Sequence, residues 1–225
     1  MGRSATAART TAPAASQPGV AKATRPRASR RLITERIRRA AIREFSMHGL
    51  HGASTQAIAE GAGLTKPQLH YYIVGKEELY VQLLGEVVAE WSDDEFGLDE
   101  TDPEAALRGY IEAKVQRAMA HPELTRLFAL EMVAGGTYLR KYWPQSVKVT
   151  GRLVAALERW IAAGRLRPLE PLALLMNIWA MTSHYADWAA QVRVMQKSFP
   201  QAARLDGTTI SREISDLVVA GCLPR

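Results

Sequence analysis

The segment of residues 54–76 constrains the fold of this chain more than any other. It reads STQAIAEGAGLTKPQLHYYIVGK, and its apolar spacing predicts two short helices around a bend at Ala62-Gly63. Thr65 is a good N-cap for the second helix, and Gln68 three residues later completes a capping-box pattern. Pro67 falls in the first turn of that helix, where its missing N–H costs little. This arrangement predicts a helix-turn-helix, a unit whose second helix enters the major groove of DNA.

The second predicted helix has an inward and an outward face. Leu69, Tyr72 and Ile73 point toward a core, which leaves polar and aromatic side chains on the outside. Such side chains can reach both phosphates and base edges. An ordinary helix pair with a solvated polar face is the alternative, but cap, turn and inward positions together favour DNA binding. The residues that we expect at the DNA are Ser54, Thr55, Thr65, Lys66, Pro67, Gln68, His70, Tyr71, Tyr72 and Lys76.

Positive charge is concentrated toward the same end of the chain. The formal net charge is +6; residues 1–34 hold seven basic and no acidic residues, whereas residues 77–225 hold 16 basic and 20 acidic ones. Such a distribution suits a polyanion such as double-stranded DNA, approached from one side. Residues 1–31 are rich in Ala, Thr, Pro and Arg and lack periodicity, so we expect a disordered basic arm. Whether this arm contacts DNA stays open at this point.

The rest of the chain predicts an all-α fold, because apolar residues recur at helical spacing between Pro and Gly breaks. We expect a three-helix head over residues 32–78, with its first helix over 33–48, and a larger helical domain over 79–225. The longer helices expected behind the helix-turn-helix cover residues 76–95, 103–121, 122–134, 142–163 and 172–194, followed by a closing helix. The 172–194 helix is apolar on most sides and should be buried on most sides.

The head resembles a known family at defined positions. Ile73 stands where that family commonly has Phe, and Gly75 where it commonly has Ser or Pro, and both changes keep the fold plausible. The residues that match are Ile37, Ala41, Phe45, Gly49, Ile58-Ala59, Ala62-Gly63-Leu64-Thr65, Leu69, Tyr72, Lys76-Glu77 and Leu79. By these residues the chain resembles the TetR-type one-component regulators. The resemblance implies a three-helix DNA head, a fourth helix as linker, and an all-helical domain that binds a ligand and dimerises.

The closing helix bears on the dimer that this resemblance implies. Ile210, Ile214, Leu217 and Val218 form one apolar stripe, which needs a surface to cover it. In the resembled family the last two helices of each subunit pair in a four-helix interface, so a homodimer is expected. The alternative is that the stripe docks on its own subunit. A dimer would hold two recognition helices roughly 34 Å apart, matching a near-palindromic operator, and repression is the default output of the family.

A second informative segment covers residues 179–188. His184, Tyr185 and Asp187 bring polar groups into an apolar helix, and buried polar groups need partners from the protein or from a ligand. Physics alone leaves both possibilities open. Residues 128–135 and 178–187 resemble the pyrimidine-utilisation regulators of the same family, which implies that Trp179 stacks on a flat heterocycle. Ser183 stands where those regulators carry a Gln, so the pocket is expected to be retained while its ligand differs.

The expected effector is therefore a small planar molecule, such as a pyrimidine or a related catabolite. Binding would shift the tilt of the linker helix and the spacing of the two recognition helices. A DNA-binding dimer that senses no ligand is the alternative. The residues that we expect around the ligand are Trp91, Glu131, Trp179, Ser183, His184 and Tyr185.

Other functional classes find little support in the sequence. An enzyme could use Asp187, His184 and Tyr185 as acid–base groups, but no nucleophile motif, phosphate loop or cofactor fingerprint accompanies them, so we expect neither catalysis nor a cofactor. The remaining histidines lack metal-ligand spacing. The apolar run Leu172–Met181 is too short to span a bilayer, and no signal peptide is recognisable. A lone Cys222 excludes an internal disulfide and fits a reducing cytoplasm.

Overall fold

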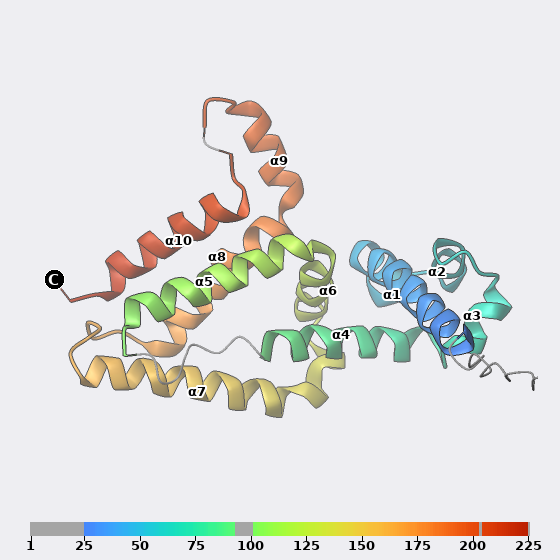
Figure 1. Cartoon of the computed structure of the whole chain (residues 1–225), viewed down its shortest axis with the longest axis horizontal. Coiled ribbons are helices and arrows are strands. Elements are labelled where there is room, and N and C mark those ends of the chain that lie inside the picture. Colours follow the sequence, from blue (N-terminus) through green and yellow to red (C-terminus); the bar gives the residue numbers. More distant parts are fainter. Residues whose placement is uncertain (1–24, 93–100, 203, 225) are drawn as a thin grey trace, which may run out of the picture.

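The computed structural model describes residues 25–92, 101–202 and 204–224, and within these ranges every regular element is a helix (Figure 1). The expected all-α fold is therefore confirmed. Residues 1–24 of the expected arm lie outside the described residues, as do residues 93–95 of the helix expected over 76–95. The elements are α1 (Arg25–Gly52), α2 (Thr55–Gly61), α3 (Lys66–Tyr72), α4 (Lys76–Ser92), α5 (Pro103–Ala120), α6 (Pro122–Val133), η1 (Thr137–Tyr142), α7 (Trp143–Ala162), α8 (Pro171–Asp187), α9 (Ala189–Ser198) and α10 (Gly207–Cys222).

Helix α1 starts earlier than the sequence suggested. It begins at Arg25 rather than Ile33, so residues 25–31, which we expected within the arm, are helical. Its regular part ends where the apolar pattern ends, because Gly49 has φ 63° and ψ −175°, directly after the expected last residue His48. Only glycine adopts such a conformation without a Cβ penalty. The backbone break at Gly49 thus separates the long helix from the turn that leads into α2.

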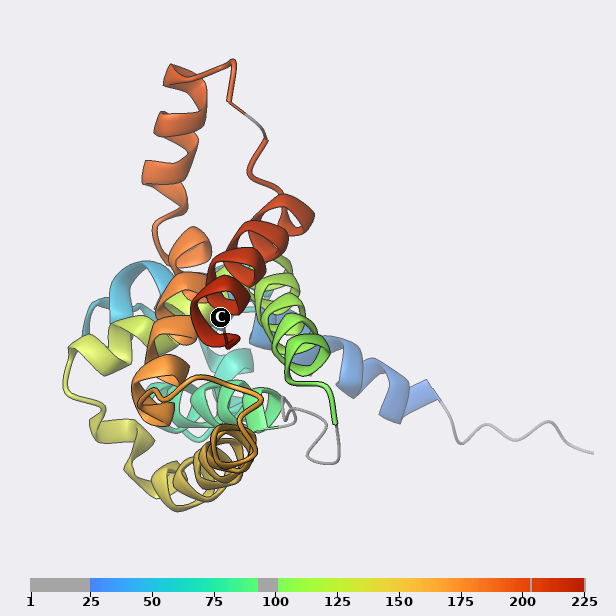
Figure 2. The same cartoon turned by 90° about the vertical axis from the view of Figure 1, so that its left-hand side faces the viewer.

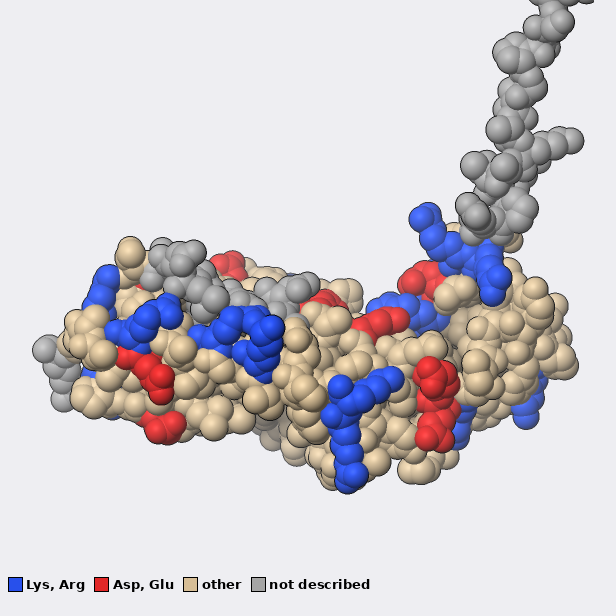
Figure 3. Space-filling model, turned by 90° about the horizontal axis from the view of Figure 1, so that it is seen from below, with Lys and Arg blue, Asp and Glu red and all other residues tan. Residues whose placement is uncertain are grey.

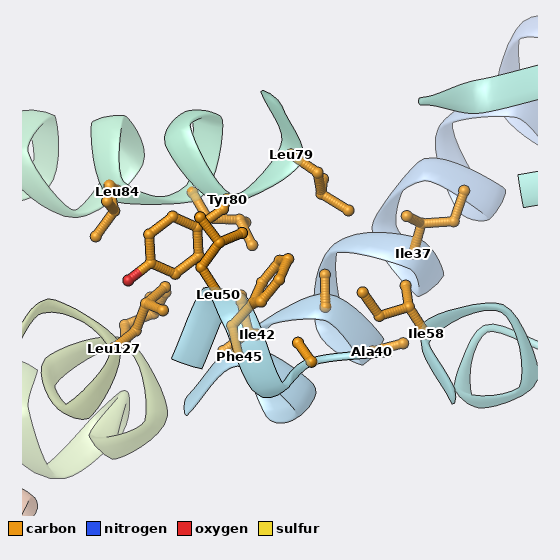
Figure 4. Packing of buried hydrophobic residues seen from close by; sticks show 14 of the residues in the cluster. Ile37, Ala40, Ile42, Phe45, Leu50, Ile58, Leu79, Tyr80, Leu84 and Leu127 are labelled. Carbon is orange, nitrogen blue, oxygen red and sulfur yellow. The ribbon is translucent and has the colours of Figure 1, made fainter. Parts of the chain in front are cut away.

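One apolar cluster runs from the head into the larger domain. Phe45 of α1 and Tyr80 of α4 meet edge to face with ring centroids 5.1 Å apart, and Figure 4 shows Leu127 of α6 beside them. Tyr80 also contacts the ring of Tyr138 in η1 at 5.7 Å. Aromatic pairs of this geometry add to the stabilisation from area burial. Helix α4 therefore belongs to the cores of both parts, and the expected boundary after residue 78 crosses a continuous core.

A second apolar cluster joins α5, α7, α8 and α10. Helix α10 lies along α5 (Figure 2), and Ile210, Ile214 and Val218 of its apolar stripe are buried there within the same chain. An ion pair of 2.7 Å between Arg108 and Asp216 joins the same two helices. The expectation that this stripe faces a second subunit is therefore wrong for these three residues. Leu217 points elsewhere and is 66 % exposed.

The apolar helix expected over 172–194 is broken into two. Helix α8 ends at Asp187, Trp188 leaves helical geometry with φ −105° and ψ 29°, and α9 continues in a new direction, away from the rest of the molecule (Figures 1 and 2). None of the residues of α9 is buried. Burial of α8 on most sides is also not observed, since Leu172 and Met176 are exposed. Both facts leave apolar surface for something else to cover.

The short 3₁₀ helix η1 was not anticipated. Gly135 (φ 102°) and Gly136 (φ 65°) turn the chain out of α6, and η1 leads directly into α7. No helix in the described ranges is long and apolar enough to cross a membrane.

Candidate DNA-binding head and effector cavity

The helix-turn-helix forms with the local contacts that its sequence predicts. The Thr65 hydroxyl accepts a hydrogen bond from the Gln68 backbone N–H at 3.4 Å, and the Gln68 side-chain oxygen accepts one from the Thr65 N–H at 2.8 Å. Ser54 caps α2 in the same way through the Ala57 N–H at 3.4 Å. Gly63 has φ 66°, and a Cβ there would overlap the Arg36 guanidinium. The bend between α2 and α3 therefore requires glycine.

Helix α3 presents its polar face to solvent. Leu69 is fully buried, while Tyr71 on the opposite side is 76 % exposed. Seen from below, Lys and Arg side chains are scattered over both the head and the larger domain, with Asp and Glu side chains among them (Figure 3). Among the residues expected at the DNA, Thr55, Tyr72 and Lys76 are half-buried, and the exposed ones are Ser54, Thr65, Lys66, Pro67, Gln68, His70 and Tyr71.

Two of these polar residues also have partners inside the head. The Lys76 ammonium donates to the Ala53 carbonyl at 2.8 Å, so it fastens the start of α4 to the turn between α1 and α2. The Gln68 side-chain oxygen is used in the capping box. For contacts to bases Gln68 therefore retains its NH₂ donors, which limits what it can recognise.

A cavity of about 800 Å³ lies between α4, α5, α6, α7 and α8. Its wall is mostly apolar, with a few polar groups, which is the composition of ligand pockets of this size. Trp91 comes from the last turns of α4, Phe128 from α6, Trp143 from the start of α7 and Trp179 from α8. Trp91 and Phe128 pack edge to face at 4.4 Å. The larger domain thus surrounds an open volume with aromatic rings.

Three aromatic residues and one lysine form a cluster in the cavity wall. The Trp179 indole N–H donates to the Tyr110 hydroxyl at 2.7 Å. The Lys114 ammonium lies 5.3 Å from the Trp91 ring centroid, 5.5 Å from Tyr110 and 5.9 Å from Trp179, within the range of cation–π attraction. These contacts fix the orientation of Trp179, so its indole is preorganised as one wall of the site.

The far end of the α8 wall carries a carboxyl group. Burial raises the pKa of Asp187 above its usual range, although a hydrogen bond from Ser183 and the charges of Arg126 and His184 lower it. Its Oδ1 is buried and has no hydrogen-bond partner within the described part of the chain. A buried polar atom without a partner costs free energy. The site is therefore incomplete at this atom.

The cavity brings together three of the six residues expected around a ligand, which are Trp91, Trp179 and Ser183. Glu131 lies outside its wall: the carboxylate accepts the Tyr80 O–H at 3.1 Å and the Tyr138 N–H at 2.8 Å, and burial and this carboxylate raise the pKa of Tyr80. Glu131 thus has a full internal role that joins α4, α6 and η1.

His184 and Tyr185 also lie outside the cavity wall. His184 is exposed and stacks on Trp188 at 6.0 Å, and Tyr185 packs against the second core. Sequence reasoning missed Tyr110 and Lys114 as wall residues, and it named Asp187 as a buried polar group or an acid–base group of an enzyme but not among the residues expected around the ligand. Their spacing shows only that Tyr110 shares a helix face with Lys114, and Ser183 with Asp187, because the members of each pair are four residues apart. The described residues contain no group of three potential metal ligands.

Comparisons with known proteins agree with this geometry. Residues 37–83 match the model for bacterial regulatory proteins of the tetR family, and residues 84–225 match that for the C-terminal region of YcdC-like proteins. The transcriptional regulator RutR of Escherichia coli K12 is 32 % identical over 83 % of this chain and 88 % of its own length. The repressor NicS of Pseudomonas putida is 30 % identical over 60 % of the chain and 64 % of its own length. The TetR-family regulator PfmR of Thermus thermophilus matches in structure with TM-score 0.66 and 21 % identity, covering 84 % of this chain and 100 % of its own.

A capped helix-turn-helix joined by one helix to a domain with an apolar cavity defines a one-component DNA-binding regulator. The chain belongs to the TetR family of bacterial regulators, and it is a DNA-binding transcriptional regulator. Regulators of this family bind operator DNA and small-molecule effectors and act as dimers.

Proposed function

We propose that this protein is a homodimeric repressor whose grip on a near-palindromic operator is controlled by a small effector in the cavity. The observation that carries the proposal is the double role of α4. Its first turn is fastened to the head through Lys76 and Leu79, and its last turns place Val88 and Trp91 in the cavity wall. A ligand that moves Trp91 therefore acts on the same rigid helix that positions the head.

A second connection between cavity and α4 runs through η1. The Tyr142 hydroxyl donates to the Val81 carbonyl of α4 at 3.0 Å, and Gly85 leaves room for this ring, because a Cβ there would overlap it. Trp143, the next residue, lines the cavity. Displacement of Trp143 by a ligand would thus pull on α4 through Tyr142. Such a device can act only if the ligand favours one arrangement over the other.

Homodimerisation is supported by apolar surface that the chain itself leaves uncovered. Trp188, Val194, Met195 and Phe199 are exposed on or beside α9, and Leu217 is exposed on α10. Contiguous exposed apolar surface marks interaction sites, so α9 is the element that we expect a second subunit to cover. Two heads related by a two-fold axis would place two α3 helices about one DNA turn apart, ~34 Å.

The effector class that we propose contains a flat ring beside Trp179, as in pyrimidines and related catabolites. Trp179 and Trp91 offer aromatic faces and edges, and the Lys114 ammonium lies 5.3 Å and 5.9 Å from the centroids of the Trp91 and Trp179 rings. Ser183 lies in the wall on the same side of α8.

The test begins with selection of bound sites from random DNA by the full-length protein. Fluorescence anisotropy on the selected duplex then gives the operator affinity with and without candidate catabolites, and quenching of tryptophan fluorescence reports their binding. We expect a two-fold symmetric site and an affinity that falls when a ligand binds. Ligand binding without any change in DNA affinity would leave a DNA-binding dimer that senses nothing through this cavity. Failure to select any DNA site would overturn the proposal that the protein is a sequence-specific repressor.

A further inference from the structure

The cavity wall on α8 is graded along its length. Leu172, Met176, Trp179, Ser183 and Asp187 all line the cavity, and their spacing of three or four residues places them on one face of the helix. At 1.5 Å per residue this face extends about 22 Å. Along it the character changes from aliphatic through aromatic to polar. A bare six-membered ring would cover only the middle of this face.

The start of the α8 wall is open and apolar, and exposed apolar side chains of α6 and α7 line other parts of the same cavity. Leu172 and Met176 of α8 are 42 % and 51 % exposed, Val147 of α7 is 69 % exposed, and Val133 of α6 is 89 % exposed. All four line the same cavity. Large apolar side chains gathered in a concave wall favour an apolar occupant, because its burial removes both surfaces from water. The cavity volume of about 800 Å³ leaves room for such a group beside a ring at Trp179.

The polar end prefers a hydrogen-bond donor without charge. The Asp187 carboxyl lines the cavity, and its Oδ1 lacks a partner. A carboxylate head on the ligand would face this oxygen with like charge. The charges of Arg126 and His184 already act on this carboxyl, so what it lacks is a hydrogen-bond donor rather than a further charge. A neutral N–H avoids the repulsion and supplies the missing bond.

From these three observations we propose that the effector is an elongated amphipathic molecule. It carries an uncharged N–H donor, such as an amide, at Ser183 and Asp187. Its flat ring lies beside Trp179, and its aliphatic group lies along Leu172 and Met176. The inference rests on the proposed function, since it specifies the ligand of the same cavity, but its test needs no DNA.

The test uses four probes and the intact protein, with binding followed by calorimetry and tryptophan fluorescence. The full probe is 3-(4-pentylphenyl)propanamide. Its partners are the isosteric 3-(4-pentylphenyl)propanoate, the tail-less 3-phenylpropanamide, and uracil. We expect the full probe to bind at least tenfold more tightly than each of the others. Equal affinity of the tail-less amide, or of the carboxylate, overturns the assignment of the corresponding end, and absence of binding by the full probe overturns the proposal.

Variants locate the two ends. Asp187→Asn should reduce the preference for amide over carboxylate to less than threefold, and Met176→Gln should remove most of the advantage of the pentyl group. Leu130→Gln is the matched control, because Leu130 is exposed on α6 outside the cavity wall, and it should change neither ratio. If the control shifts both ratios as strongly, the contacts lie elsewhere and the inference fails.

The failure of this inference differs from the failure of the proposed function. Release of operator DNA by uracil, with no binding of the full probe, would leave effector control standing and overturn only the amphipathic ligand. Tight binding of the full probe with unchanged DNA affinity would support the amphipathic ligand and overturn the control of DNA binding by an effector in this cavity.

Discussion

The helix-turn-helix and the effector cavity differ in the range over which their contacts are formed. In the head, the capping box joins residues three apart, and the bend depends on Gly63 alone. In the cavity, Trp179 is held by Tyr110, 69 residues away, and five helices supply the wall. The head can therefore keep its outward face unchanged while the larger domain repacks. The shape of the cavity depends on how five helices pack, so it can respond to what fills it.

The strongest test of this contrast is the core that both regions share. Phe45 is fully buried against Tyr80, at the point where head and α4 meet. Phe45→Ala should lower the free energy of unfolding by about 3–5 kcal/mol, because it leaves a cavity in that core. Urea unfolding followed by circular dichroism measures the loss. Leu32→Ala, at an exposed position of α1, is the control and should cost under about 0.5 kcal/mol. A loss confined to the signal of the head would show that the two regions unfold separately, against the continuous cluster.

Glu131 sharpens the comparison, because it is buried yet lies outside the cavity wall. Glu131→Gln keeps the size of the side chain but introduces an NH₂ group opposite the donors of Tyr80 and Tyr138. We expect a loss of about 1–3 kcal/mol in stability and a weaker effect of the effector on DNA affinity, with ligand affinity nearly unchanged. The measurement is a thermal melt together with an operator titration in the presence of ligand. Glu123→Gln, exposed in the first turn of α6, is the control. Loss of ligand affinity as large as that of a Trp179→Ala variant would return Glu131 to the ligand site.

The contact of η1 with α4 is testable by a double-mutant cycle. Gly85→Ala places a methyl group against the Tyr142 ring and should cost about 1–3 kcal/mol through overpacking. In a Tyr142→Ala background the same change should cost far less, because the ring is gone. Unfolding free energies of the four proteins give the coupling. Additive effects would mean that Gly85 of α4 and Tyr142 of η1 are not coupled, and the proposed connection from Trp143 to α4 would be wrong.

Two aspartates, one in the cavity wall and one at a helix cap, differ in how their surroundings change the carboxyl pKa. Asp187 lines the cavity, and Asp206 caps α10. Burial raises the pKa of Asp187, so the folded state holds its proton more tightly, and stability falls as pH rises from the usual aspartate pKa through the raised value. Asp206 caps α10 through the Thr209 N–H at 2.9 Å, which lowers its pKa. Its contribution is present above the usual aspartate pKa and is lost as pH falls toward the lowered value. At neutral pH, Asp187→Asn should therefore raise the melting temperature relative to the unchanged protein, and Asp206→Asn should lower it. Melts repeated toward acidic pH should show both differences shrinking. The same direction for both variants would contradict the assigned burial of Asp187.

The head was predictable almost residue by residue because its signals are local. Caps, a Gly in the bend and a Pro in the first turn act within one or two helical turns, so Thr65, Gln68 and Gly63 could be assigned from the chain alone. The early start of α1 was missed, since Ala, Arg and Ser around residues 25–31 show no apolar periodicity although the backbone is helical there.

The cavity was predictable only in part, because its members come from separate helices. Trp179 and Ser183 could be identified, whereas Lys114 and Tyr110 carry no local mark that separates a cavity face from a core face. Glu131 reads equally as ligand contact or internal anchor until Tyr80 and Tyr138 are seen beside it. The break at Trp188 was missed since the apolar pattern continues across it, although the backbone of Trp188 leaves helical geometry.

The smallest expected effect concerns two lysines of the head with different surroundings. Lys66 is exposed at the start of α3, whereas the Lys76 ammonium is hydrogen-bonded to the Ala53 carbonyl. If both contact phosphates, each Lys→Ala change should lower the slope of log affinity against log salt by about one unit for all sequences. Because Lys76 also fastens the head to α4, only its loss should lower the melting temperature as well. Operator titrations from low to moderate salt, paired with thermal melts, separate the two roles. An unchanged salt slope for Lys66→Ala would remove this residue from the DNA interface, and an unchanged melting temperature for Lys76→Ala would mean that its bond to Ala53 contributes nothing to holding the head.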